Sequence, residues 1–155
     1  MEEGGQVAIR GLRGLEGVYL VIEGIAGPDD IAGMTERLLR EDAEVCLRRM
    51  GMPPMGAGEW LSTSGSPHLY VRVEVAADGL AGAPDEGETA GLAATVQVRE
   101  KVSLERSPAV RVMAPVWSSQ CVGQVEGGEL QESIRASVSS LLEEFAEAYE
   151  RANAS

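Results

Sequence analysis

The chain has 155 residues, of which 44% are apolar, and its 25 acidic and 13 basic side chains give a net charge of −12 and a pI near 4.5. A chain of this length and composition can bury a core without disulfides or metals, so we expect one folded domain over residues 1–155. The acidic balance argues against nucleic acid as a partner, because affinity for phosphate backbones comes from clustered Lys and Arg.

The cysteines and the single histidine argue against a metal site. Cys46 and Cys121 lie far apart, neither belongs to a Cys-x-x-Cys pair, and His68 is the only histidine. The sequence therefore predicts no zinc site and no cofactor, and it leaves open whether the two thiols are bridged or separate. We find no signal peptide at the first residues and no apolar run near the roughly 20 residues that cross a bilayer.

The first third of the chain predicts a strand and a helix. Residues 1–6 have the composition of a flexible tail, and residues 18–23 form a β-branched apolar run that ends at Gly24. Thr35 suits the N-cap of a helix, because its hydroxyl can accept a bond from a first-turn N–H. We expect that helix to end at Gly51, before two prolines that cannot continue it.

Three strands should follow. Residues 53–67 have loop composition, and residues 69–75 alternate apolar with polar side chains, which is typical of a half-buried strand. Residues 77–92 are rich in Gly, Ala and acidic residues and predict a mobile loop. Similar alternation predicts strands at about 95–105 and 110–116.

The end of the chain and one proline complete the predicted fold. An apolar stripe with helical spacing covers residues 130–152. Pro115 cannot donate to a ladder and therefore indicates an edge strand or a bulge. The order β-α-β-β-β-α predicts an α+β two-layer sandwich, with a mixed, mostly antiparallel sheet and two helices packed on one face. The other face should be wet or an interface; its side chains would include Tyr70, Arg72, Glu74, Gln97, Arg99, Lys101 and Arg111.

Glu100 is the first candidate for a functional residue. It falls in phase with the apolar side chains of the 95–105 strand, where a buried carboxylate needs a partner or a shifted pKa. It is therefore a candidate acid or ligand contact. The alternatives are a bulge that turns it outward or a position at the margin of the sheet, and these carry more weight.

Two tryptophans mark the other candidates. Trp117 opens the segment 117–121, which holds two serines and Cys121, but no Gly-x-Ser-x-Gly elbow surrounds them and only His68 could serve as a base. A turn with a packed Trp117 is the simpler interpretation. Trp60, in the Pro/Gly loop, is either an exposed recognition residue or a plug at one end of the core.

A resemblance adds an expectation about location. The element order resembles the N-terminal domain of TolB and related envelope modules. The chain also resembles a family of uncharacterised bacterial proteins through the segments LYVRV at 69–73, VSLER at 102–106, VWSS at 116–119, IR at 134–135 and LLEEF at 141–145. These resemblances imply an exported or periplasmic protein, with a cytoplasmic one as the alternative, and they imply no activity.

We therefore expect a non-catalytic binding or assembly module, with a protein partner or a second copy of itself. Its contacts would come from the wet face of the sheet, from an open strand edge, or from the loops. Two alternatives remain: a small hydrolase-like enzyme centred on Glu100 or on residues 117–121, and a structural homo-oligomer.

Overall fold

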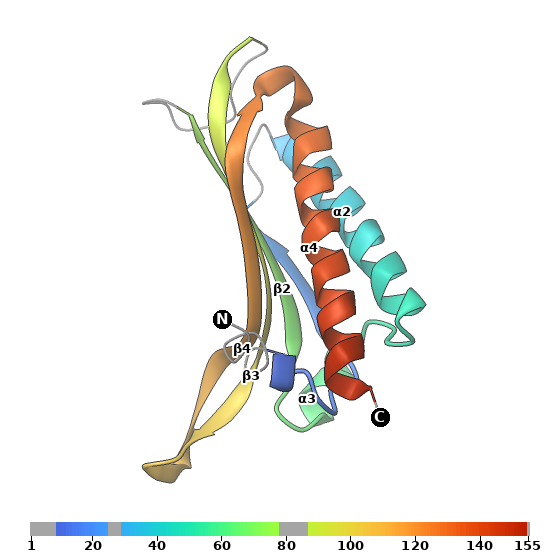
Figure 1. The fold of residues 1–155 in the computed structure, drawn as a ribbon, viewed down its shortest axis with the longest axis vertical. Helices are drawn as coiled ribbons and strands as arrows, with labels where there is room; N and C mark the ends of the chain where they lie inside the picture. Colours follow the sequence, from blue (N-terminus) through green and yellow to red (C-terminus); the bar gives the residue numbers. More distant parts are fainter. Residues whose placement is uncertain (1–8, 25–28, 78–86, 155) are drawn as a thin grey trace.

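The computed structural model describes residues 9–24, 29–77 and 87–154 (Figure 1). The predicted tail at 1–6 and most of the predicted loop at 77–92 lie outside these residues. The described elements are β1 (Tyr19–Glu23), α2 (Asp29–Arg49), α3 (Ala57–Ser62), β2 (His68–Ala77), β3 (Thr89–Leu104), β4 (Ser107–Glu126), a 3-10 turn (Gly127–Glu129) and α4 (Leu130–Asn153).

The strands form one sheet in the order β1-β2-β3-β4. β1 is parallel to β2, whereas β2–β3 and β3–β4 are antiparallel. α2 and α4 lie side by side on one face of this sheet (Figure 1). The predicted α+β two-layer fold, with two helices on one face, is confirmed.

The core lies between the sheet and these two helices. Its fully buried side chains come from both layers, among them Val71, Val96, Leu39, Leu141 and Phe145. Across the helix pair, Arg135 on α4 donates two hydrogen bonds to Asp42 on α2, of 3.1 Å and 3.0 Å. The helix layer is therefore held by both apolar packing and a paired charge.

The end of α2 follows the prediction, but its start does not. Gly51 has φ +77°, and the Met52 N–H donates to the Leu47 carbonyl at 2.9 Å, as in a left-handed C-terminal cap. The helix begins at Asp29, so Thr35 is not its N-cap. Thr35 is buried inside the helix, where its hydroxyl accepts a hydrogen bond from Gln131 on α4. Contact with α4 thus satisfies a hydroxyl that the sequence alone assigned to a cap.

Other boundaries also differ from the prediction. The loop expected at 53–67 contains α3, and residues 89–92, expected in a loop, begin β3. β4 extends from Ser107 to Glu126 rather than over 110–116, so the turn expected at 117–121 is part of a strand. In each strand a ladder partner along the neighbouring strand overrides the local Gly and Ser content.

Pro115 lies where the prediction puts it, on an edge strand and next to a bulge. Val98 pairs with Trp117 and Arg99 with Pro115, so Val116 is an extra residue of β4. β2 pairs with β3 only as far as Arg99. Beyond this point no other strand pairs with β3 and β4, which form a two-stranded arm that projects past the sheet (Figure 1). At the base of the arm the Lys101 N–H donates to the Gly65 carbonyl at 2.7 Å.

On the face of the sheet away from the helices, one side chain is less exposed to solvent than predicted. Tyr70 is only 8% exposed, although its alternation predicted a solvated side chain. The Arg99 guanidinium lies 4.6 Å from the centre of its ring, and the His68 ring stands edge-on to it at 6.2 Å. Arg99 on the neighbouring strand and His68 on the same strand therefore cover this tyrosine on the face that was expected to be open.

Candidate functional site

Glu100 lies where the arm leaves the sheet. It is half-buried and lines a pocket of about 300 Å³, together with residues from the segment before β1 and from the turn before β2: Gly11, Arg13, Gly14, Leu15, Glu16, Thr63, Ser64 and Pro67. Burial raises the pKa of the Glu100 carboxyl. The glutamate is the first residue of β3 beyond the last pair with β2, which is the margin of the sheet.

Among the described residues, no pair of hydrogen-bonded acid and base side chains lines this pocket. Within the described residues no side chain or backbone group donates a hydrogen bond to the Glu100 carboxylate. Gly65 lies so close to it that a Cβ at that position would stand 2.6 Å from Oε2. Acid–base chemistry needs a second positioned group, and Arg13 and Glu16, which also line the pocket, make no hydrogen bond or ion pair with Glu100 in the described structure.

The residues of the 117–121 segment point to opposite faces of the sheet. Trp117, Ser119 and Cys121 face the helices, because they pair with core residues of β3. Ser118 faces the open side, where the Gln97 amide donates to its hydroxyl at 3.2 Å.

β3 separates these side chains from His68 on β2. The Nδ1 of His68 is buried and has no partner among the described residues, and burial, followed by the charge of Arg99, lowers the pKa of the imidazole. No serine or cysteine of the described chain therefore pairs with His68 as nucleophile and base.

The two tryptophans are packed. The Trp60 ring stacks on Tyr19 with centres 5.1 Å apart, and its Nε1 donates to the Ser66 carbonyl at 2.6 Å. Trp117 is buried against Phe145 of α4. Each ring fills space between elements, so neither projects as an isolated anchor for a partner.

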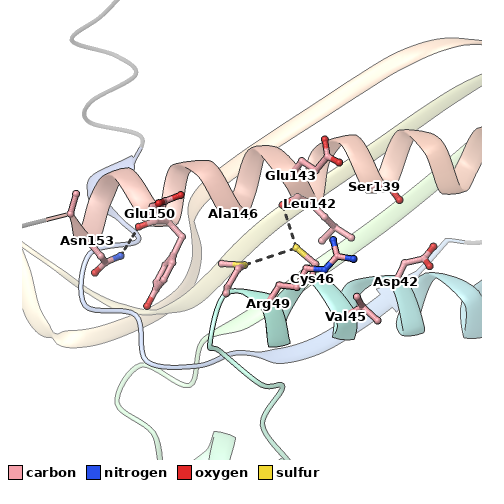
Figure 2. A pocket seen from close by; sticks show the side chains of 13 residues that line it. Asp42, Val45, Cys46, Arg49, Ser139, Leu142, Glu143, Ala146, Glu150 and Asn153 are labelled. Carbon is pink, nitrogen blue, oxygen red and sulfur yellow. Dashed lines mark hydrogen bonds between the residues drawn. The ribbon is translucent and has the colours of Figure 1, made fainter.

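A groove of about 980 Å³ lies between α2 and α4 (Figure 2). Cys46 lies in it, with Sγ 3.6 Å from the Leu142 carbonyl and 4.0 Å from the Met50 sulfur. Burial raises the pKa of this thiol, and Glu143 raises it further against the opposing effect of Arg49. A protonated thiol is a weak nucleophile, so the described geometry of the groove indicates no reaction at Cys46.

Of the two edge strands in the described sheet, β4 is the longer. β4 has 20 residues and is the last strand of the sheet, so no described strand pairs with its outer edge. Such an edge presents unpaired N–H and C=O groups that can accept another strand. The opposite edge, β1, has only five residues, and short edge strands offer little to a partner.

The two halves of β4 differ in how well the edge is protected. Prolines, bulges and charges discourage strand addition, and Pro108, Arg111, Pro115 and the Val116 bulge all lie in the first half. Residues 117–125 contain no proline and no charge. On the open face this half presents Ser118, Gln120, Val122 and Gln124, all exposed, with Val122 at 77%.

No protein-family model matches the chain, and no curated protein sequence matches it. No group of three or more His, Cys, Asp or Glu side chains within the described ranges is placed to hold a metal ion. Among the described helices none is both long and apolar enough to cross a membrane.

Sequence reasoning missed the second half of β4 and the groove between the helices. β-branched Val122 and Val125 were a signal for a longer strand, but Gly123 and the run of small polar residues pointed to a turn. The groove depends on how α2 and α4 lie side by side, which no local pattern specifies.

Proposed function

We propose that the protein is a non-catalytic binding and assembly module that captures an extended strand of a protein partner along the outer edge of β4. The observation that carries this proposal is the outer edge at residues 117–125, which has no partner among the described strands and contains no proline and no charged residue. In β-augmentation the backbone of the edge strand supplies affinity, and alternate side chains supply specificity.

The charge pattern supports a protein strand as the ligand. The surface as a whole carries a net charge of −12, which disfavours nucleic acid and anionic lipid. The edge itself is uncharged over residues 117–125. A neutral strand with alternating apolar and polar side chains therefore meets little electrostatic opposition there.

We also propose a location in the bacterial cell envelope, with the cytoplasm as the alternative. The support is the resemblance of the element order to TolB-like envelope modules. Fractionation of the source cells, with an antibody against the protein, tests this part separately. Recovery with the cytoplasmic markers would contradict an envelope location and would leave strand capture untouched.

Selection of peptides from a random library on the immobilised protein tests strand capture. The edge variant carries Gln120→Lys and Val122→Lys, because lysines on an edge strand discourage pairing. The matched control carries Ala93→Lys and Thr95→Lys, which stand opposite these two residues on β3, one strand inward on the same face.

The proposal predicts that selected peptides bind the wild type and the control alike and bind the edge variant roughly tenfold or more weakly. Peptides that bind the edge variant as well as the wild type, or a library that yields no binder to the monomeric protein, would contradict strand capture. Loss of binding in the control alone would move the site to the open face of the sheet.

A further inference from the structure

We propose that the strand captured by β4 is the β4 strand of a second copy, paired antiparallel about a two-fold axis at Ser119. This inference rests on the proposed function, because it names the partner of the same edge. A two-fold interface places the same surface on both subunits, so the edge must be complementary to itself. Three features of β4 meet that requirement.

The first feature is the position of the charges. Over its 20 residues β4 carries only two charged side chains, Arg111 and Glu126. Both lie on the open face, since they pair with Ser103 and Thr89 of β3, which alternate with the core residues of that strand. An antiparallel pair centred on Ser119 sets Arg111 of each copy directly opposite Glu126 of the other.

The second feature is the bulge, which makes this register possible. Side chains alternate between the two faces of a strand, so without the extra residue Val116 the side chains of Arg111 and Glu126 would lie on opposite faces. They could then not face each other across a two-fold pair. With the bulge, Ser118 stands opposite Gln120, Trp117 opposite Cys121, and Pro115 opposite Val122 of the other copy. Every opposed pair then shares a face of the sheet.

The third feature is the exposed apolar surface of β4. Val112, Met113 and Val122 are 41%, 42% and 77% exposed. In the proposed register Val122 meets Pro115 on the open face, and Val112 meets Val125 on the helix face. Met113 lies opposite Gln124. Pairing thus covers the apolar side chains that a free edge leaves in water.

The result would be one continuous sheet made from both four-stranded sheets, with the helices of both copies on one face. Three other groups adjoin the pairing region. Gly11 packs against the Val116 carbonyl so closely that a Cβ on it would stand 2.2 Å from that oxygen. Glu144 on α4 accepts a hydrogen bond from the Ser119 hydroxyl, and Glu126 accepts one from the Gly87 N–H at 2.9 Å. A test of the pairing should therefore leave Ser119 unchanged and should not rely on a Glu126 substitution alone.

Mixed-disulfide trapping tests the register. Cys46→Ala and Cys121→Ser remove the native thiols, and two differently tagged proteins then carry Ser118→Cys or Gln120→Cys. Directly opposed residues of antiparallel strands have Cβ atoms about 4.5–5.5 Å apart, close enough for a disulfide. We expect mild oxidation to join the Ser118→Cys protein to the Gln120→Cys protein, and neither protein to itself. Self-linking of either protein, or no linking, would overturn the register.

Exchanging the charges of Arg111 and Glu126 tests the pairing without cysteines, with sedimentation equilibrium as the measure of self-association. Arg111→Glu faces Glu126 with a like charge at two symmetric positions and should weaken self-association by roughly tenfold. Arg111→Glu combined with Glu126→Arg should restore it, which a merely structural defect would not do. Arg106→Glu, at the tip of the arm and outside the ladder, makes the same change of charge and should leave association unchanged.

The outcomes also separate this inference from the proposed function. A protein that stays monomeric at high concentration, yet binds selected peptides along β4, would overturn self-pairing and leave strand capture standing. A dimer that ignores Arg111→Glu and forms no mixed disulfide would overturn self-pairing as well. Failure of both the peptides and the dimer would remove the β4 edge as a binding surface.

Discussion

The rings of Trp117 and Phe145 lie 5.4 Å apart and are tilted by 52°, joining the edge strand β4 to helix α4. Trp117 follows the Val116 bulge directly, so the side chain that anchors the edge strand lies beside the residue that shifts its register. The edge is therefore held from the core side while its outer side stays open.

Trp117→Ala should destabilise the protein by about 3–5 kcal/mol, because it removes a buried aromatic ring and leaves a cavity against Phe145. Urea unfolding followed by circular dichroism measures the change. Val122→Ala is the matched control on the same strand; its side chain is exposed, so its effect should stay within about 0.5 kcal/mol. Equal losses in the two variants would contradict the packing described for β4.

Glu100→Gln should stabilise the protein at neutral pH. Burial raises the folded-state pKa of this carboxyl above its ordinary value of 4.5, so the charged form is the less stable one in the folded protein. The contribution of Glu100 to stability is present below pH 4.5 and is lost as the pH rises through the raised pKa. The advantage of the glutamine variant should thus disappear on acidification, which thermal unfolding across pH measures. A variant that is less stable at neutral pH would indicate a partner for the carboxylate.

His68 should destabilise the folded protein in mild acid. Its folded-state pKa is lowered from 6.5, first by burial and then by Arg99, so the unfolded chain binds the proton more readily. The stability is present above pH 6.5 and is lost as the pH falls from that value through the lowered pKa of the folded state. His68→Phe, which keeps an aromatic ring beside Trp60 and Tyr70, should flatten this loss between about pH 8 and pH 5.5. If the free energy of unfolding of the wild type and of His68→Phe changes with pH in parallel, His68 is not the source of the loss.

Gly65→Ala should destabilise the protein for two separable reasons. The residue has φ +82°, which costs a residue with a Cβ about 1–2 kcal/mol, and the new Cβ would stand 2.6 Å from the Glu100 carboxylate. In a Glu100→Ala background the second cost is absent, so the same substitution should be milder. A double-mutant cycle with chemical unfolding measures this coupling, and additive effects would contradict the close contact.

The sequence supported the fold further than it supported the site. The alternation at 69–75 and the helical stripe at 130–152 each report one buried face, and this decided the two-layer architecture. Thr35 was misassigned because its hydroxyl is satisfied by Gln131, which lies far along the chain. Local chemistry identifies a group that needs a partner and does not say which distant residue supplies it.

The candidate site was harder to predict, because an edge is a property of the whole sheet. Pro115 indicated an edge or a bulge, and both were found. Residues 117–125 extend that edge because β4 pairs with the full length of β3. Small polar residues such as Ser118 and Ser119 do not predict such a long strand.

Residue-resolved amide hydrogen exchange along β4 tests most directly whether the outer side of this strand is free to pair. In dilute protein, alternate amides between residues 117 and 125 should be protected by β3 and the intervening ones should exchange fast. Adding a selected peptide, or raising the protein concentration, should slow only the fast set. Uniform protection of β4 in dilute protein, or slowing confined to the α2–α4 groove, would contradict a free and pairing-competent edge.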